Sequence, residues 1–335
     1  MNNNFFMGNI GGEIFIPAVI AFLCALVTAP VLIPWLHKLK FGQQILEDGP
    51  VWHKKKQGTP TMGGIIFIIG VIAAGIVAFL VKPDTHLLML LLISLGFGAI
   101  GFIDDYIKVV KKRNLGLTAW QKLILQGALA VIYVIVLNKT GDLNTEIVIP
   151  FMKETVKMPW WLYISFILFV VVGTVNSVNL TDGLDGLAAT ITVVVTLFFG
   201  ICGVVSGGGA AAYFSSAVIG GLLAFLIFNH YPAKVFMGDT GSLFLGGAVS
   251  VLAVGLKMPL ILVIVGFVYL FEALSVILQV ASFQLTGKRI FKMSPIHHHF
   301  EMCGWRENKI VAVFTLVTAV LCVIGFFAVK KYLCI

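Results

Sequence analysis

Five aspartates stand at the edges of long apolar runs: Asp104, Asp105, Asp182, Asp185 and Asp239. Carboxylates near membrane depth are costly and usually functional. When the apolar runs are threaded alternately through a bilayer, all five aspartates fall on one face, together with most lysines and arginines and the histidine triplet 297–299. Aspartates gathered with cations and histidines predict a metal-dependent site for a charged, phosphate-bearing substrate.

The pair Asp104-Asp105 ends the third apolar run. Neighbouring helical residues point about 100° apart, so the two carboxylates cannot have the same role. Lys108 follows Asp104 by four residues, a spacing that also suits an ordinary ion pair at a helix end. Two adjacent carboxylates near a low-dielectric boundary repel each other, however, and a bound metal or cation would relieve that repulsion.

Between the fifth and sixth runs, polar residues recur at every third position, as Asn176, Asn179, Asp182 and Asp185. Glycines follow both aspartates and let the backbone approach a ligand closely. Amides and carboxylates in this arrangement could bind a nucleobase or ribose and part of a metal shell. The alternative is a polar turn between two helices.

The connection before the eighth run carries Asn229, Phe236 and Asp239. Asp239 could be a simple helix N-cap, but its place on the shared face favours a metal ligand. Phe236 could stack on a planar base, although a single Phe more often belongs to a core. We expect His297 and His298 to donate hydrogen bonds to a phosphate or sugar, because adjacent histidines rarely bind one zinc ion.

A basic segment, Lys54-Lys55-Lys56, precedes Gly58-Thr59-Pro60-Thr61 at the start of the second run. Such lysines bind anionic headgroups or set topology, whereas main-chain N–H groups at the helix start could bind an anion. The chain has no P-loop motif, so ATP hydrolysis of that type is not indicated.

The composition sets the fold class: of 335 residues, 59% are hydrophobic and 11% charged, against about 25% charged in soluble domains. We expect an all-α polytopic membrane protein, one integral membrane domain over 1–335. The hydropathy predicts ten transmembrane helices, at 14–36, 60–81, 86–107, 122–138, 160–177, 186–205, 211–229, 239–256, 259–283 and 309–330.

An even number of spans places both termini on the same side of the membrane. Of the 23 lysines and arginines, 16 lie on the opposite side. Because basic loops are more frequent in the cytoplasm, this bias predicts that both termini lie outside. The N-terminus lacks the features of a cleaved signal peptide. The outer segment 139–159 is equally consistent with a short β-hairpin and with an irregular loop.

The residues alone favour phosphoryl transfer, with Asp-bound Mg²⁺ neutralising a diphosphate and a lipid phosphate as acceptor. A secondary transporter or flippase is the competing class, and Glu272, a charged residue deep in the ninth run, is its best support. A packed or water-lined glutamate explains Glu272 better. A non-catalytic scaffold would leave five clustered aspartates unexplained.

Four motifs resemble those of the polyprenyl-phosphate N-acetylhexosamine-1-phosphate transferases: 104–108, 179–186, 236–242 and 295–301. The last of these, together with 58–64, is similar to the phospho-N-acetylmuramoyl-pentapeptide branch of that family. The resemblance covers nearly the whole chain. It implies a ten-helix bundle, usually a homodimer, in the bacterial inner membrane, with no nucleic-acid partner.

The resemblance implies transfer of phospho-N-acetylmuramoyl-pentapeptide from its UDP carrier to undecaprenyl phosphate, with Mg²⁺ as cofactor and lipid I and UMP as products. Asp239 would bind Mg²⁺, and Asp104 would act as base or position the lipid phosphate, beside Asp105. The uridine side would be lined by Asn179, Asp182, Asp185, Asn229 and Phe236. Further substrate contacts would come from Lys56, Thr61, Lys108, Lys122, Gln279, His297 and His298.

Two alternatives stay open. The transfer could be a single displacement, or it could pass through an aspartyl-phosphate in two steps. The donor could instead be UDP-N-acetylglucosamine, as in other members of the same family.

Overall fold

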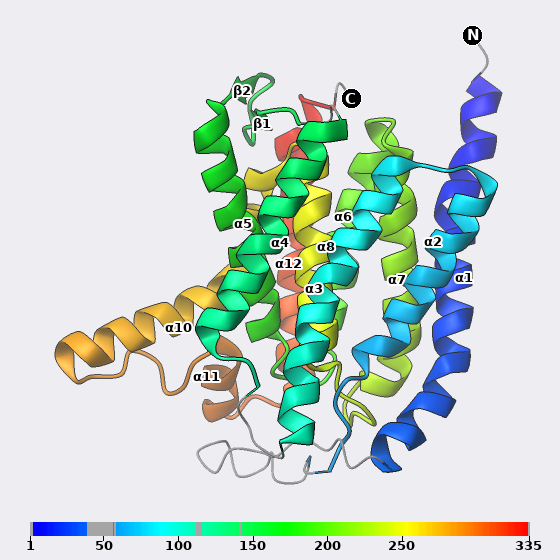
Figure 1. The fold of residues 1–335 in the computed structure, drawn as a ribbon. Coiled ribbons are helices and arrows are strands. Elements are labelled where there is room, and N and C mark those ends of the chain that lie inside the picture. The colour runs from blue at the N-terminus through cyan, green and yellow to red at the C-terminus, as the bar shows by residue number, and fades with distance from the viewer. Residues whose placement is uncertain (1–2, 39–55, 57, 112–115, 141–142, 334–335) are drawn as a thin grey trace.

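The computed structural model describes residues 3–38, 56, 58–111, 116–140 and 143–333. Within these ranges ten helices are long and apolar enough to cross a membrane, as predicted (Figure 1). They are α1 (Asn3–Lys38), α2 (Gly64–Val81), α3 (Thr85–Val110), α4 (Ala119–Thr140), α5 (Trp160–Thr181), α6 (Leu187–Val205), α7 (Gly209–Asn229), α8 (Gly238–Gly255), α10 (Phe267–Thr286) and α12 (Glu307–Lys330). Lys54 and Lys55 lie outside the described residues.

The ninth predicted span is interrupted. A 3₁₀ turn, η2 (Pro259–Ile261), and a short helix, α9 (Leu262–Val265), precede α10. The break falls at Gly266, where a Cβ would press on the main-chain carbonyl of Leu262. We had placed the histidine triplet in a loop, but it lies on the short helix α11 (Ile296–Met302). In Figure 1, α10 leans out of the bundle and α11 lies below it.

The outer segment forms the hairpin rather than the irregular loop. Strand β1 (Glu146–Val148) pairs antiparallel with β2 (Thr155–Lys157), and Ile147 stands opposite Val156. The hairpin lies at the end of the bundle where α1 begins and α12 ends (Figure 1). The opposite end of the bundle holds the end of α3 and the start of α8.

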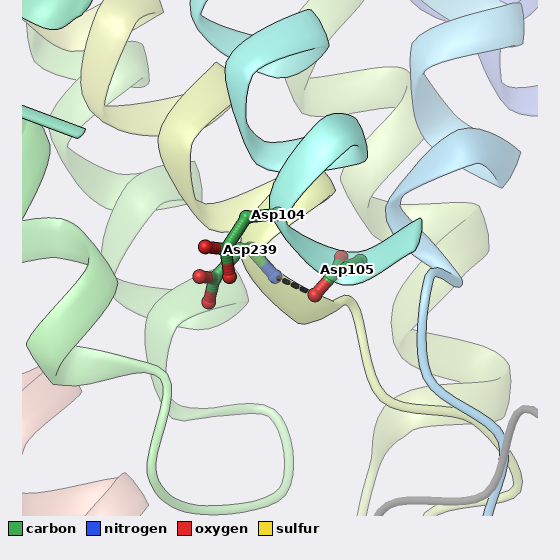
Figure 2. A group of neighbouring side chains, drawn as sticks. All are labelled: Asp104, Asp105 and Asp239. Atoms are coloured by element: carbon green, nitrogen blue, oxygen red, sulfur yellow. Dashed lines mark hydrogen bonds between the residues drawn. The ribbon is translucent and has the colours of Figure 1, made fainter. Parts of the chain in front are cut away.

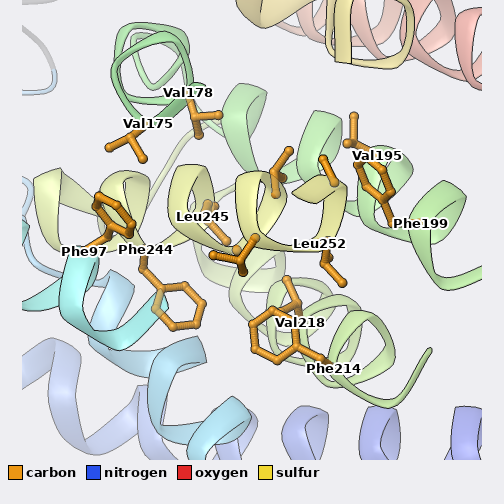
Figure 3. Close-up of a cluster of buried hydrophobic side chains, with 14 of the residues drawn as sticks. Phe97, Val175, Val178, Val195, Phe199, Phe214, Val218, Phe244, Leu245 and Leu252 are labelled. Carbon is orange, nitrogen blue, oxygen red and sulfur yellow. The ribbon is translucent and has the colours of Figure 1, made fainter. Parts of the chain in front are cut away.

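The core is built around α8, whose residues from Thr240 to Val254 are all buried. Side chains of α3, α5, α6 and α7 surround it, with Phe244, Leu245 and Leu252 at the centre (Figure 3). A Cβ at Gly246 would meet the main chain of Val175 on α5. Because membrane helices gain stability from close packing, such small residues fix α8 against its neighbours and so fix the position of its N-terminus.

Candidate active site

The end of α3 touches the first turn of α8. A Cβ at Gly101 would overlap the main chain of Asp239, so only glycine permits this approach. Asp105, one turn further along α3, accepts a hydrogen bond from the backbone N–H of Asp239 at 3.2 Å (Figure 2). It accepts a second one from the backbone N–H of Thr240 at 2.9 Å. It also accepts one from the Thr240 hydroxyl (2.7 Å). The helix N-terminus is therefore capped by a carboxylate from another helix, and Asp239 lies in the first turn of α8 with its own carboxylate free of any capping role.

Asp239 meets two lysines and an amide. Its Oδ2 pairs with Nζ of Lys108 at 3.0 Å and with Nζ of Lys122. Its Oδ1 accepts a hydrogen bond from Nδ2 of Asn179 at 2.9 Å. Both lysines also reach Oδ2 of Asp104, Lys108 at 2.6 Å and Lys122 at 3.1 Å. We call this group the Asp239 cluster: Asp104, Asp105, Lys108, Lys122, Asn179 and Asp239.

The carboxylates of Asp104, Asp105 and Asp239 offer oxygens that lie within 4.8 Å of one another (Figure 2). Carboxylate oxygens are the ligands that hard divalent cations prefer. Asp105 is committed to the N-terminus of α8, whereas Asp239 Oδ2 and Asp104 Oδ2 are held by lysine ammonium groups, cations that a metal ion could replace. The donor set therefore fits a metal, with Asp239 and Asp104 as its best ligands.

A second polar contact aligns the helices that carry Lys122 and Asn179. Asn176 on α5 donates a hydrogen bond from Nδ2 to Oε1 of Gln126 on α4 at 2.7 Å, and the Gln126 side chain is fully buried. Gln126 lies one turn after Lys122, and Asn176 lies one turn before Asn179. The amide pair thus sets the register in which α4 and α5 present Lys122 and Asn179 to Asp239.

A separate ionic group lies nearby. Lys56 pairs with Asp185 Oδ1 at 2.7 Å and with Glu307 Oε1 at 2.6 Å. Glu307 also accepts the backbone N–H of Asp185, and Asp185 Oδ2 accepts that of Ala233. Burial lowers the pKa of Lys56, but the carboxylates of Glu307 and Asp185 outweigh it and hold that pKa above its usual value. We call Lys56, Asp185 and Glu307 the Lys56 clasp.

Asp182 stands between the two groups. Burial raises the pKa of its carboxyl well above the usual range, and the negative charges of Asp239, Asp105 and Asp185 raise it further. The sequence had placed Asp182 and Asp185 together. In the structure, Asp185 belongs to the Lys56 clasp, whereas the pKa of Asp182 is raised by charges of both the clasp and the Asp239 cluster.

Several other predicted site residues make contacts within the chain. Asn229 Oδ1 accepts the N–H of Gly186, and its Nδ2 donates to the carbonyl of Val235. The amide of Gln279 bonds the main chain at Ile290 and Phe291. The backbone of Phe236 bonds both Pro60 and Gly63, which ties its loop to the segment before α2.

Thr61 lies beside the Asp239 cluster. A Cβ added at Gly238, which has a positive φ of 69°, would meet Asp105 Oδ2 at 2.5 Å and Thr61 Oγ1 at 2.6 Å. Glycine is therefore required at the start of α8, where Thr61 and Asp105 converge.

The two histidines have acidic partners. His297 Nδ1 lies 3.0 Å from Oε2 of Glu272, and His298 Nδ1 lies 2.7 Å from Oε2 of Glu301. Glu272 is fully buried, so the sequence interpretation of a packed glutamate is confirmed.

Sequence reasoning did not select Glu307, Gln126 or Glu272 for the site. Glu307 looks like an ordinary acidic residue in the first turn of a helix. Gln126 had no distinguishing pattern. Glu272 carried a signal, an isolated charge in an apolar span, but its partner stands 25 residues away in sequence.

The chain matches two descriptions of protein families. Residues 87–257 match the model of glycosyl transferase family 4. Residues 56–68 match signature 1 of the phospho-N-acetylmuramoyl-pentapeptide-transferases. The matched segments contain Lys56, Thr61 and the whole Asp239 cluster.

Curated relatives resemble the chain over almost its full length. A phospho-N-acetylmuramoyl-pentapeptide-transferase of Acetivibrio thermocellus is 52% identical over 325 residues, which cover 96% of this chain and 97% of the relative. A protein of the same name from Clostridium novyi is 51% identical over 315 residues, which cover 93% of this chain and 96% of the relative. One from Clostridium perfringens is 52% identical over 319 residues, which cover 95% of this chain and 99% of the relative.

Proposed function

Because this chain belongs to the phospho-N-acetylmuramoyl-pentapeptide-transferase family, we propose that it transfers phospho-N-acetylmuramoyl-pentapeptide from its UDP carrier to undecaprenyl phosphate. The products are lipid I and UMP, which makes this the first membrane step of peptidoglycan synthesis and ties the protein to cell shape and division. The Asp239 cluster carries the proposal, because its carboxylates and lysines suit a reaction between two phosphates.

The cofactor we propose is Mg²⁺, with Asp239 as the principal ligand and Asp104 as its neighbour. Bound there, the ion would supply positive charge that stabilises the diphosphate and the departing UMP.

The reaction we propose is a single displacement. An oxygen of undecaprenyl phosphate attacks the phosphorus on the sugar side of the diphosphate, the bond from that phosphorus to the UMP oxygen breaks, and UMP keeps the electron pair. Lys108 and Lys122 hold positive charge where the phosphate oxygens gather, in a partly buried site that strengthens the attraction. Asp104 orients the lipid phosphate, and Asp105 fixes α8 so that Asp239 stays in place.

The nucleotide-sugar would lie beside the cluster, towards the Asp182–Asp185 turn. Its contacts would come from Lys56, Thr61, Asn179, Asp182, Asp185, Asn229, Phe236, Gln279, His297 and His298. The backbone bonds between Phe236 and the segment before α2 support this placement, because they bring the Thr61 and Phe236 segments together.

We further propose that the protein lies in the bacterial inner membrane as a homodimer, with both termini outside and the Asp239 cluster at the cytoplasmic side. The excess of lysine and arginine in the loops at the cluster's end supports this orientation.

A purified-protein assay for UMP release tests the proposal. Undecaprenyl phosphate and Mg²⁺ are combined with either UDP-N-acetylmuramoyl-pentapeptide or UDP-N-acetylglucosamine. We expect UMP from the first donor and none without Mg²⁺ or without the lipid. No UMP from either donor would refute the transferase, and release from UDP-N-acetylglucosamine alone would assign the chain to the other branch.

A further inference from the structure

Glu272 and His297 form a buried pair that the proposed reaction does not yet use. Glu272 is fully buried on α10, and its Oε2 lies 3.0 Å from Nδ1 of His297 on α11. The same oxygen lies 3.5 Å from the backbone nitrogen of His297. Two contacts to one residue fix both the start of α11 and the orientation of the imidazole ring.

This contact decides which ring nitrogen remains available. A carboxylate accepts the proton-bearing Nδ1–H, so Nε2 is left for another partner. Nε2 of His297 is buried and has no hydrogen-bond partner among the described residues. Buried polar atoms are rarely left unpaired, so Nε2 is available to a partner beyond the described residues.

The ring points at the substrate side of the site. A Cβ at Gly183 would overlap Nε2 and Cε1 of His297, so the imidazole edge rests directly on the turn that follows Asp182. This is the turn between α5 and α6 that also leads to Asp185 and the Lys56 clasp.

We propose that Glu272 is a positioning residue: it holds the His297 ring with Nε2 presented to the nucleotide-sugar at the Asp182–Gly183 turn. The inference rests on the proposed function and adds a residue that acts through His297 rather than on substrate. It also gives Glu272, the charged residue within α10, a role other than the ion coupling expected of a transporter.

The test compares Glu272→Gln with the wild type in the UMP assay, with the two substrates varied separately. Glutamine keeps the shape and one acceptor oxygen but removes the charge. Loss of a carboxylate that orients a metal-bound histidine typically costs about 10- to 100-fold, and we take the same range for the orientation of His297. We expect the KM for the nucleotide-sugar to rise by about that factor, and the KM for undecaprenyl phosphate to stay within about twofold. An unchanged donor KM, or an equal rise in both KM values, would overturn the inference.

A double-mutant cycle separates positioning from a structural role. If Glu272 acts through His297, Glu272→Gln has almost no further effect in a His297→Ala background. An undiminished effect there would show that Glu272 acts by some other route.

Ser275→Ala provides the matched control, because Ser275 is buried one turn further along α10 and its hydroxyl bonds only the carbonyl of Glu272 among the described residues. We expect wild-type kinetics from it. If the wild type releases UMP and Glu272→Gln has wild-type kinetics, the positioning role is refuted but the transferase activity stands. If the wild type releases no UMP, the transferase activity itself is refuted.

Discussion

The Asp239 cluster and the Lys56 clasp are built from the same residue types, yet they are held differently. In the cluster, Asp104 and Asp105 also accept main-chain N–H groups. The Asp239 carboxylate, by contrast, is bonded among the described residues by the side chains of Lys108, Lys122 and Asn179. In the clasp, each carboxylate also accepts a main-chain N–H, Asp185 from Ala233 and Glu307 from Asp185.

This difference determines what each group can do. Lysine side chains can turn from a carboxylate to a phosphate or give way to a metal ion, so Asp239 can exchange its partners. Main-chain bonds cannot be exchanged without moving the backbone. The clasp therefore joins Lys56, the α5–α6 turn, the loop at Ala233 and the start of α12 into one support. Whether a carboxylate can exchange its partners thus depends on whether main-chain N–H groups also hold it.

The largest effect is expected at Asp239. Asp239→Asn keeps the side-chain shape and removes the charge that attracts Mg²⁺ and the lysines. We expect UMP release to fall by on the order of 1,000-fold or more. The thermal unfolding midpoint in detergent should stay close to that of the wild type, because Asp105, not Asp239, caps α8.

Asp84→Asn is the control for that substitution, since Asp84 caps α3 through its side chain and asparagine can cap as well. Its activity should match the wild type. Substantial activity in Asp239→Asn at ordinary Mg²⁺ would remove Asp239 from the metal site and with it the contrast between the two groups.

Glu307→Gln should lower stability more than activity, the reverse of Asp239→Asn. It removes one of the two carboxylates that pair with Lys56 and weakens the joint. Hydrogen bonds to charged groups contribute roughly 1.5–3 kcal/mol, so we expect the unfolding midpoint to fall clearly. Activity should fall by only about tenfold or less.

Thermal unfolding and UMP release on the same preparation measure both effects. The exposed Glu154→Gln is the control for a lost carboxylate and should change neither. If Glu307→Gln kept full stability but lost activity as Asp239→Asn does, the clasp would act in the transfer as directly as Asp239, and not as a support beside the nucleotide-sugar.

The sequence predicted the ten spans and the shared face of the five aspartates, because hydropathy and helical spacing are local properties. The ion pair from Lys108 to Asp104, which the structure contains, was only the alternative to a bound metal or cation. The sequence could not distinguish the cluster from the clasp. Asp105 and Asp239 are 134 residues apart, and Lys56 and Glu307 are 251 apart. Which acid meets which lysine follows from the packing of glycines such as Gly101 and Gly246, and a single sequence does not reveal such contacts.

The smallest effect on stability is expected at Asp182, a buried carboxyl whose pKa is raised by burial and by the negative charges of the Asp239 cluster and the Lys56 clasp. Its raised pKa means that folding favours the protonated carboxyl. That contribution to stability is present below the unfolded pKa of about 3.9 and is lost as the pH rises through the folded pKa. Asp182→Asn cannot ionise, so its stability should gain on the wild type as the pH rises from about 4. Unfolding midpoints measured across that range in EDTA check this. A pH-independent difference would mean that the pKa of Asp182 is not raised, and that neither burial nor the charges of Asp239 and Asp185 act on its carboxyl.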